Sequence, residues 1–191
     1  TVAVQTGVFL IGAVLFPIGF CMLYLMGFDL LTGVFMLTPL AWLAKRPGVT
    51  PSQILRNWGF VFLGNFAGAL TVAFMMSYIF TMGYNVDGGA IATKVASIGE
   101  ARTLGYAEHG VAGWITIFIR GMLCNWMVSL GVVGAMISTH VSGKVLAMWF
   151  PIMLFFFMGF EHSVVNMFLF PFGLIMGGDF SVMDYFVWNE I

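Results

Sequence analysis

Apolar residues along the chain form four long stretches, and the length of each stretch predicts its helices. The stretches lie at about 7–44, 54–84, 110–139 and 144–176. A helix that crosses a bilayer needs about 20 predominantly apolar residues, so the second and third stretches each predict one spanning helix. The first and fourth are too long for one straight helix and contain glycine and proline inside the apolar run. We therefore expect each of these two to be a broken helix.

A segment of the first stretch recurs in the fourth stretch at a constant spacing. Residues 26–39 line up with residues 158–171; Met, Gly, Phe, Leu and Pro coincide, and Asp29 is matched by Glu161. One apolar stretch follows the first copy, and another precedes the second. Adding the missing partner to each copy gives repeats of three spans, and an odd number of spans inverts one repeat relative to the other. We therefore expect an all-α inverted repeat, of which this chain contains the middle four of six spans and is incomplete at both ends.

The two copies also predict where a ligand binds. Unwound backbone is tolerated at membrane depth only where protein buries it or where it lines a cavity. Interrupted segments at matching positions of two repeats point to the binding site of a transporter. We expect Asp29 and Glu161 to act as a loop scaffold, because their carboxylates can accept hydrogen bonds from the free backbone N–H groups of each break.

The composition places these helices in a lipid bilayer. Hydrophobic residues make up 61% of the 191 residues and charged residues 8%, whereas a soluble domain carries about 25% charged residues. The chain is therefore expected to be a multi-pass integral membrane protein. A net charge of −1 without a basic cluster in the sequence excludes nucleic acid as a partner.

Charge placement predicts the orientation in the membrane. The connections at 45–56 and 140–144 contain basic residues and no acid, whereas the connection at 85–109 and the tail after residue 177 contain most of the acids. The positive-inside rule puts the first two connections on the cytoplasmic or stromal side. The connection at 85–109 and the tail are then expected on the outer side.

Residues 159–168, Gly-Phe-Glu-His-Ser-Val-Val-Asn-Met-Phe, resemble the formate/nitrite transporter family, and the resemblance extends to residues 123–130, 28–32 and 64–69. It implies one channel domain over 1–191, an aquaporin-like arrangement of six spans per protomer, one pore in each protomer and a homopentamer. It also implies small monovalent anions as substrates: formate, nitrite, hydrosulfide, lactate or bicarbonate. The overall pattern is similar to the algal chloroplast-envelope branch, which is linked to nitrite or bicarbonate. A chloroplast envelope or a bacterial inner membrane is therefore expected as the location.

The resemblance implies roles for individual residues. His162 matches the central histidine of the pore, Thr32 matches a threonine on the opposite loop, and Asn125 matches an asparagine of the fourth helix that orients the network. Six residues match apolar constrictions and walls of the pore: Phe16, Phe20, Leu30, Val128, Phe155 and Phe160.

One position departs from the family pattern. Many members have a lysine in the outer vestibule, 16 residues before the fourth-helix asparagine, and this chain has His109 there. Lys94 and Arg102 are the candidates to take the place of that lysine in the vestibule.

His162 is also a functional candidate on physical grounds, independently of the family resemblance. An ionisable side chain inside an apolar segment is costly and indicates a functional site. A neutral imidazole can donate one hydrogen bond to an anion and exchange a proton with it, whereas a permanent charge would trap the ion. We therefore expect a weak acid to cross as a nearly neutral species.

Three other polar residues inside apolar stretches are expected to be structural. Asn65 and Asn166 predict hydrogen bonds between helices rather than contacts with a substrate. Arg120 lies within the third stretch and is expected to pair with an acid or with backbone at a subunit interface.

Two other functions remain as alternatives to an anion channel. An aquaporin-type channel for neutral solutes predicts Asn-Pro-Ala at both breaks, and the sequence contains it at neither. A pore-less membrane subunit of a redox complex predicts paired histidines on its helices. The three histidines and two cysteines have no HxxxH or CxxC spacing, so neither a metal nor another cofactor is expected. No nucleophile, Walker or dinucleotide motif indicates an enzyme.

Overall fold

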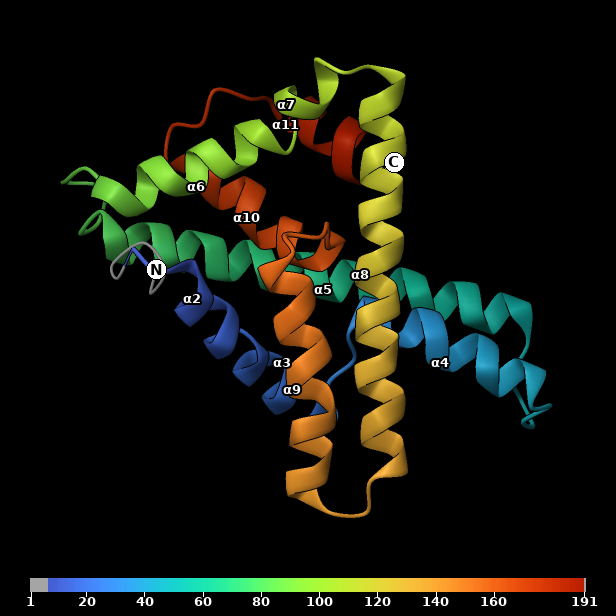
Figure 1. The fold of residues 1–191 in the computed structure, drawn as a ribbon. Coiled ribbons are helices and arrows are strands. Elements are labelled where there is room, and N and C mark those ends of the chain that lie inside the picture. Colours follow the sequence, from blue (N-terminus) through green and yellow to red (C-terminus); the bar gives the residue numbers. More distant parts are fainter. Residues whose placement is uncertain (1–6, 191) are drawn as a thin grey trace. The chain divides into compact units, whose positions relative to one another are not determined.

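The computed structural model describes residues 7–190, and all regular secondary structure within that range is helical (Figure 1). Two helices are long and apolar enough to cross a membrane, α5 (Pro51–Phe80) and α8 (Val111–Ile137). The remaining elements are α2 (Phe9–Leu15), α3 (Pro17–Leu25), α4 (Leu31–Leu43), α6 (Gly89–Ala101), α7 (Leu104–Ala107), α9 (Val141–Phe157), α10 (Ser163–Ile175), α11 (Val182–Tyr185) and the π-helix η1 (Phe186–Glu190). The stretch at 7–44 thus contains α2, α3 and α4, and the stretch at 144–176 contains most of α9 and all of α10.

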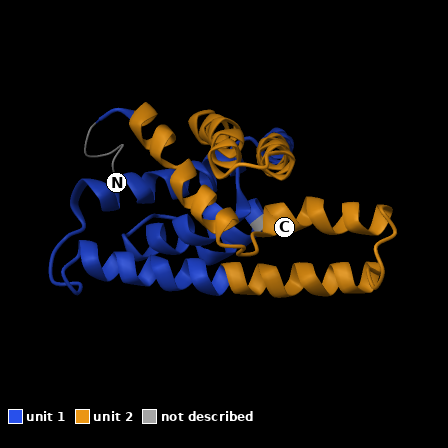
Figure 2. Cartoon of the chain, turned by 90° about the horizontal axis from the view of Figure 1, so that it is seen from below, with its two compact units in different colours: residues 1–8, 66–122, 161–191 blue, residues 9–65, 123–160 orange. Residues whose placement is uncertain are grey.

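The chain forms two compact units, which are coloured separately in Figure 2. Of the described residues, unit 1 contains 7–8, 66–122 and 161–190, and unit 2 contains 9–65 and 123–160. Helices α5 and α8 each run from one unit into the other. Each unit therefore takes residues from both halves of the sequence.

The core of unit 2 is formed by α3, the second half of α8, and α9. Cys124, Val128 and Val132 of α8 are buried with Ile152 and Phe155 of α9. Aromatic rings of α3, its N-cap residue Phe16, and α9 pack against this cluster, and Phe16 stacks on Phe156 with 4.3 Å between ring centroids. Burial of such rings is the main favourable term in packing, and the ring pairs add a directional contribution.

Unit 1 is organised around the packing of α6 on α10. Helix α6 was expected to be part of a connection, because 85–109 contains several charged residues. The structure shows a helix there, with Ala92, Ala96 and Gly99 buried. Their spacing of four and three residues places them on one helical face, and small side chains allow two helices to approach closely. The charged residues of this segment drew attention away from that face.

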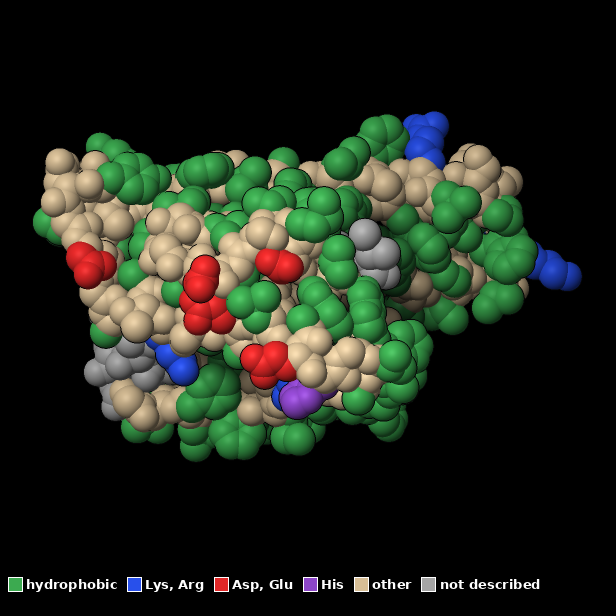
Figure 3. Space-filling model, turned by 90° about the horizontal axis from the view of Figure 1, so that it is seen from above, with side chains coloured by type: hydrophobic (Ala, Val, Ile, Leu, Met, Phe, Trp, Pro, Cys, Tyr) green, Lys and Arg blue, Asp and Glu red, His purple; other side chains and the backbone are tan. Residues whose placement is uncertain are grey.

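Both units expose large apolar side chains over much of their surface. Phe118 of unit 1 is 71% exposed and Ile137 of unit 2 is 77% exposed. Figure 3 shows apolar side chains over most of one face, with carboxylates gathered on part of it. Asp87, Glu100, Glu108 and Asp179 of unit 1 line shallow pockets beside α6. An apolar surface of this extent suits contact with lipid or with other subunits.

The two broken helices have the same local backbone at the spacing of the sequence repeat. Helices α4 and α10 each have 13 residues. Gly27 and Gly159 follow the preceding helix ends with φ values of 73° and 65°. The N–H of Phe28 donates to the carbonyl of Leu23 at 3.0 Å, and the matching pair of the second copy, Phe160 and Phe155, bonds at 3.2 Å. This is the Schellman motif, in which a residue with positive φ ends a helix.

The correspondence continues to the far end of each second helix. Lys45 follows α4 with a φ of 51°, and Gly177 follows α10 at the matching position with a φ of 87°. The N–H of Arg46 donates to Ala41 at 3.0 Å, and the N–H of Gly178 donates to Gly173 at 2.9 Å. The repeated sequence therefore corresponds to a repeated backbone over residues 25–46 and 157–178.

Replacing Gly99 with alanine is expected to destabilise unit 1. An added Cβ would overlap with the buried ring of Phe180, and overpacking of this kind costs about 1–3 kcal/mol. Thermal unfolding of the full-length protein in detergent should show a lower Tm for Gly99→Ala. Gly121→Ala is the control, because a Cβ there meets no neighbour within 4 Å; an equal Tm for the two variants would contradict the packing described here.

Candidate functional site

His162 forms the N-terminal cap of α10 at the second break. Its side chain is 5% exposed, and its Nδ1 accepts a hydrogen bond from the N–H of Val165 at 3.3 Å. A nitrogen that accepts carries no proton, so this bond assigns the proton of the neutral ring to Nε2. The helix thereby fixes the tautomer, and Nε2–H is the hydrogen-bond donor of the side chain.

Glu161, the residue before this histidine, is buried and its two carboxylate oxygens are both bonded. Oε1 accepts from the hydroxyl of Tyr106 at 2.9 Å. Oε2 accepts from Nδ2 of Asn166 at 3.1 Å and pairs with Nη1 of Arg102 at 3.2 Å. A buried carboxylate needs such partners, because burial without them costs several kcal/mol.

Four further hydrogen bonds complete this group of side chains. Nη1 of Arg102 also donates to Oδ1 of Asn166 at 2.8 Å. The amide of Asn189 accepts from Asn166 and donates to the carbonyl of Arg102. A guanidinium nitrogen of Arg120 donates to the hydroxyl of Tyr106. We call these six residues the Glu161 cluster: Arg102, Tyr106, Arg120, Glu161, Asn166 and Asn189.

The cluster changes one expectation from the sequence. Glu161 was expected to bind backbone N–H groups of the break, but its carboxylate binds three side chains instead, and His162 caps the helix. The pairing of Arg120 with an acid or backbone at a subunit interface stays a prediction; within this chain Arg120 donates to the hydroxyl of Tyr106. The expected structural role of Asn166 is confirmed, since its amide connects α10 to both Arg102 and Asn189.

The three basic candidates for the vestibule lie in different surroundings. Arg102 belongs to the Glu161 cluster, and its side chain is 20% exposed. Lys94 lies on α6 and His109 lies just after α7, and both are exposed. Of the three, Arg102 is the one in contact with the residues beside His162.

The first break is held by a different residue from the one expected. Oδ1 of Asn65, on α5, accepts from the N–H of Leu31 at 3.0 Å, and its Nδ2 donates to the carbonyl of Asp29 at 3.1 Å. Among residues 7–190 the carboxylate of Asp29 has no hydrogen bond or ion pair, and this residue is exposed. Asn65 therefore takes the scaffold role predicted for Asp29, and its expected role as a helix-bridging residue is confirmed.

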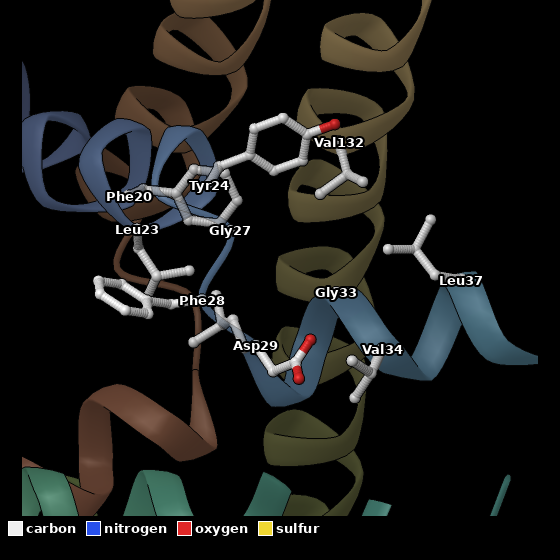
Figure 4. A pocket seen from close by; sticks show the side chains of 11 residues that line it. Phe20, Leu23, Tyr24, Gly27, Phe28, Asp29, Gly33, Val34, Leu37 and Val132 are labelled. Atoms are coloured by element: carbon white, nitrogen blue, oxygen red, sulfur yellow. The ribbon is translucent and has the colours of Figure 1, made fainter. Parts of the chain in front are cut away.

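A pocket of about 190 Å³ opens beside the first break, within unit 2 (Figure 4). Figure 4 shows the carboxylate of Asp29 among apolar side chains of α3, α4 and α8. Two of the predicted constriction residues, Phe20 and Leu30, line this pocket. The remaining constriction residues pack in the core of the same unit: Val128 and Phe155 are fully buried, and Phe16 and Phe160 are half-buried against them.

Two predicted pore residues of unit 2 carry buried polar atoms without a partner. These are Oγ1 of Thr32, at the start of α4, and Oδ1 of Asn125, on α8; neither has a hydrogen bond within the described part of the chain. A buried polar atom that lacks a partner is uncommon and calls for an explanation such as a bound ligand or ion. Oδ1 of Asn57, on α5, shares this property; of the three side chains, Thr32 and Asn125 are the predicted pore residues.

Tyr106 and Asn189 are functional candidates that the sequence did not reveal. Tyr106 lies 55 residues before its partner Glu161, and Asn189 lies 23 residues after its partner Asn166. Neither falls in a motif or at helical spacing from its partner. The one available signal was that Asn189 is polar and follows the apolar run Phe-Val-Trp.

The geometry can be compared with known proteins. A family model described as Formate/nitrite transporter matches residues 1–191. The chain belongs to the formate/nitrite transporter family. Members of this family are integral membrane channels and transporters, not enzymes.

Named relatives agree with this assignment. The probable formate transporter of Methanothermobacter thermautotrophicus is 36% identical over 177 residues, which cover 87% of this chain and 61% of that protein. The formate channel FocA of Haemophilus influenzae is 34% identical over 184 residues, which cover 95% of this chain and 59% of that protein. The chain thus spans about three fifths of the length of these curated relatives.

Solved structures share the fold. An FNT family ion channel superimposes with a TM-score of 0.76 and 26% identity, over 96% of this chain and 70% of that chain. A pentameric formate channel with formate bound gives a TM-score of 0.71 at 22% identity, over 95% of this chain and 66% of that chain. The second likeness, at this identity, concerns the fold alone.

Replacing Asn65 with leucine is expected to destabilise the first break of this formate/nitrite transporter family member. The N–H of Leu31 would lose its partner, and an unpaired buried donor costs about 1–3 kcal/mol. Thermal unfolding in detergent should give a lower Tm for Asn65→Leu. Asn57→Leu on the same helix is the matched control, because Oδ1 of Asn57 has no partner among the described residues. If both substitutions leave the Tm unchanged, the hydrogen bonds of Asn65 to Leu31 and Asp29 have no stabilising role.

Proposed function

We propose that the full-length protein conducts small monovalent anions of the formate, nitrite or bicarbonate class through a pore in each protomer, with His162 at its centre. The observation that carries this proposal is the state of His162. Its ring is buried, its Nδ1 is held by the N-terminus of α10, and its Nε2–H is a donor. Family membership and the named formate transporter and formate channels support the substrate class.

In the proposed mechanism, groups of the protein replace the water molecules around the anion one after another. The N-termini of α4 and α10, which directly follow the two breaks, carry partial positive charge that attracts an anion. The hydroxyl of Thr32, which lacks a partner in the described residues, donates a hydrogen bond in place of water. The imidazole of His162 donates a hydrogen bond to the anion from Nε2 and keeps that proton, because the neutral ring has no other. The proton that neutralises the weak acid comes from water, so that the acid passes the apolar constrictions nearly uncharged.

The proposal includes the architecture expected from the repeat. The full-length protein has two inverted repeats of three spans, and residues 1–191 supply the middle four spans. The matching backbone of residues 25–46 and 157–178 supports this arrangement. Lys94 and His109, both exposed, line the outer vestibule in this proposal, and Asn125 orients the network around His162.

The finer choice among substrates and membranes rests on the family resemblance. We propose nitrite or bicarbonate as the physiological anion and a chloroplast envelope or a bacterial inner membrane as the location. Parallel flux measurements with bicarbonate, nitrite and formate in liposomes would rank these anions directly.

Replacing His162 is expected to abolish anion selectivity and most of the flux. His162→Asn keeps a good helix cap but removes the imidazole ring, so anion flux into proteoliposomes should fall by roughly tenfold or more. Full-length protein is reconstituted with a pH- or anion-sensitive dye inside the vesicles. His140→Asn, at the exposed N-cap of α9, is the matched control. Wild-type flux and selectivity in His162→Asn would rule out the central role.

The full-length protein is expected to assemble as a homopentamer. The exposed apolar side chains of both units need lipid or protein against them, and a structural neighbour is described as pentameric. Native mass spectrometry of the protein released from detergent should give five copies per particle. A monomer or a tetramer under conditions that keep the protein active would contradict this assembly.

A further inference from the structure

The Glu161 cluster contains more positive charge than its one carboxylate balances. Arg102 pairs with Glu161 directly, and Arg120 reaches it through the hydroxyl of Tyr106. The other members, Asn166 and Asn189, are neutral amides. Two guanidinium groups thus face one carboxylate, and the hydrogen bonds and ion pair within the cluster bring in no other charged group of the described chain.

Arg120 supplies the charge that remains in excess. It lies on α8, one of the two helices long and apolar enough to span a membrane. Among the side chains of residues 7–189 its guanidinium has one hydrogen-bond partner, the neutral hydroxyl of Tyr106. A guanidinium has five N–H donors, and a charge at membrane depth is costly unless it serves a path for ions or finds a partner.

Tyr106 links the charged guanidinium of Arg120 to Glu161 but does not neutralise that charge. Its hydroxyl accepts from Arg120 and donates to Oε1 of Glu161 at 2.9 Å. In such a chain each hydrogen bond polarises the next, and the low dielectric of the surroundings strengthens the effect. Glu161 directly precedes His162 in the chain, so the hydrogen-bonded series Arg120–Tyr106–Glu161 ends at the residue next to the buried histidine.

We propose that Arg120 is a specificity-determining residue, which gives the second break a net positive charge and thereby sets the apparent affinity of the pore for anions. This inference rests on the proposed anion conduction and adds to it the residue that controls affinity. A charge in a low-dielectric site acts over a longer range than one in water. The first break has no such charge, because Asn65, which holds it, is neutral.

The test measures formate flux into proteoliposomes of the full-length protein over a range of formate concentrations. Arg120→Gln removes the excess charge and should raise the half-saturating concentration by roughly tenfold, while the maximal flux changes less. Arg120→Lys keeps the charge and should stay close to wild type. Tyr106→Phe keeps both arginines but removes the bridging hydroxyl, so it separates the charge from the hydrogen bond. If Tyr106→Phe and Arg120→Gln shift the half-saturating concentration equally, Arg120 acts only by holding Tyr106, and the inference fails.

Replacing the carboxylate of Glu161 should change the half-saturating concentration in the opposite direction. Glu161→Gln increases the excess positive charge and should lower the half-saturating concentration of formate. The double variant Arg120→Gln/Glu161→Gln has the wild-type excess of one positive charge and should return toward the wild-type value. A Glu161→Gln variant with a raised half-saturating concentration contradicts the inference even if Arg120→Gln does not fold.

A control variant and the flux of the wild-type protein distinguish a failure of this inference from a failure of the proposed function. Arg46→Gln removes an exposed arginine outside the cluster and should leave the half-saturating concentration unchanged. If wild-type protein carries no formate, nitrite or bicarbonate flux above empty liposomes, the proposed function itself is wrong. If wild-type protein carries flux and Arg120→Gln has the wild-type half-saturating concentration, the proposed function stands and the role of Arg120 is wrong.

Discussion

Every free backbone N–H and C=O group at membrane depth must find a partner inside the protein, because lipid offers none. This constraint acts most strongly at the two places where a helix stops and another begins within an apolar stretch. Both breaks use the same backbone solution, a Schellman ending with a glycine at positive φ. They differ in how the helix that follows is started. At the first break the amide of Asn65 reaches across from α5, and at the second His162 caps α10 with its own ring.

The two copies of the repeat therefore have the same backbone at the break but different side-chain chemistry. His162 stands at the position of Leu30 in the first copy, so one cap residue is an imidazole and the other is a leucine. Because α10 occupies Nδ1, the ring presents Nε2–H as its donor. The acids have diverged as well: Asp29 is exposed beside a pocket, whereas Glu161 is buried, paired with Arg102 and linked to Arg120 through Tyr106. The charged chemistry is thus concentrated at the second break.

The repeat and the family could be predicted from local sequence patterns, whereas contacts between residues distant in the sequence could not. The spacing between residues 26–39 and 158–171 could be read directly, because a repeated backbone leaves a repeated pattern of glycine, proline and acid. The family could be identified from the run around His162, and the family match agrees. Helix α6 was missed because its buried face is made of alanine and glycine, which composition alone does not distinguish from a loop. The Glu161 cluster was missed because it joins residues up to 87 positions apart, and only the folded chain brings them together.

The central claim is that His162, at the second break, contacts the anion as it crosses the membrane. A cryo-electron microscopy map of the full-length protein in lipid nanodiscs, recorded with a heavy monovalent anion such as iodide, tests it most directly. The account predicts ion density within each protomer next to Nε2 of His162, with the Glu161 cluster bonded as described. Ion density confined to the interfaces between protomers, or breaks that face lipid, would contradict it.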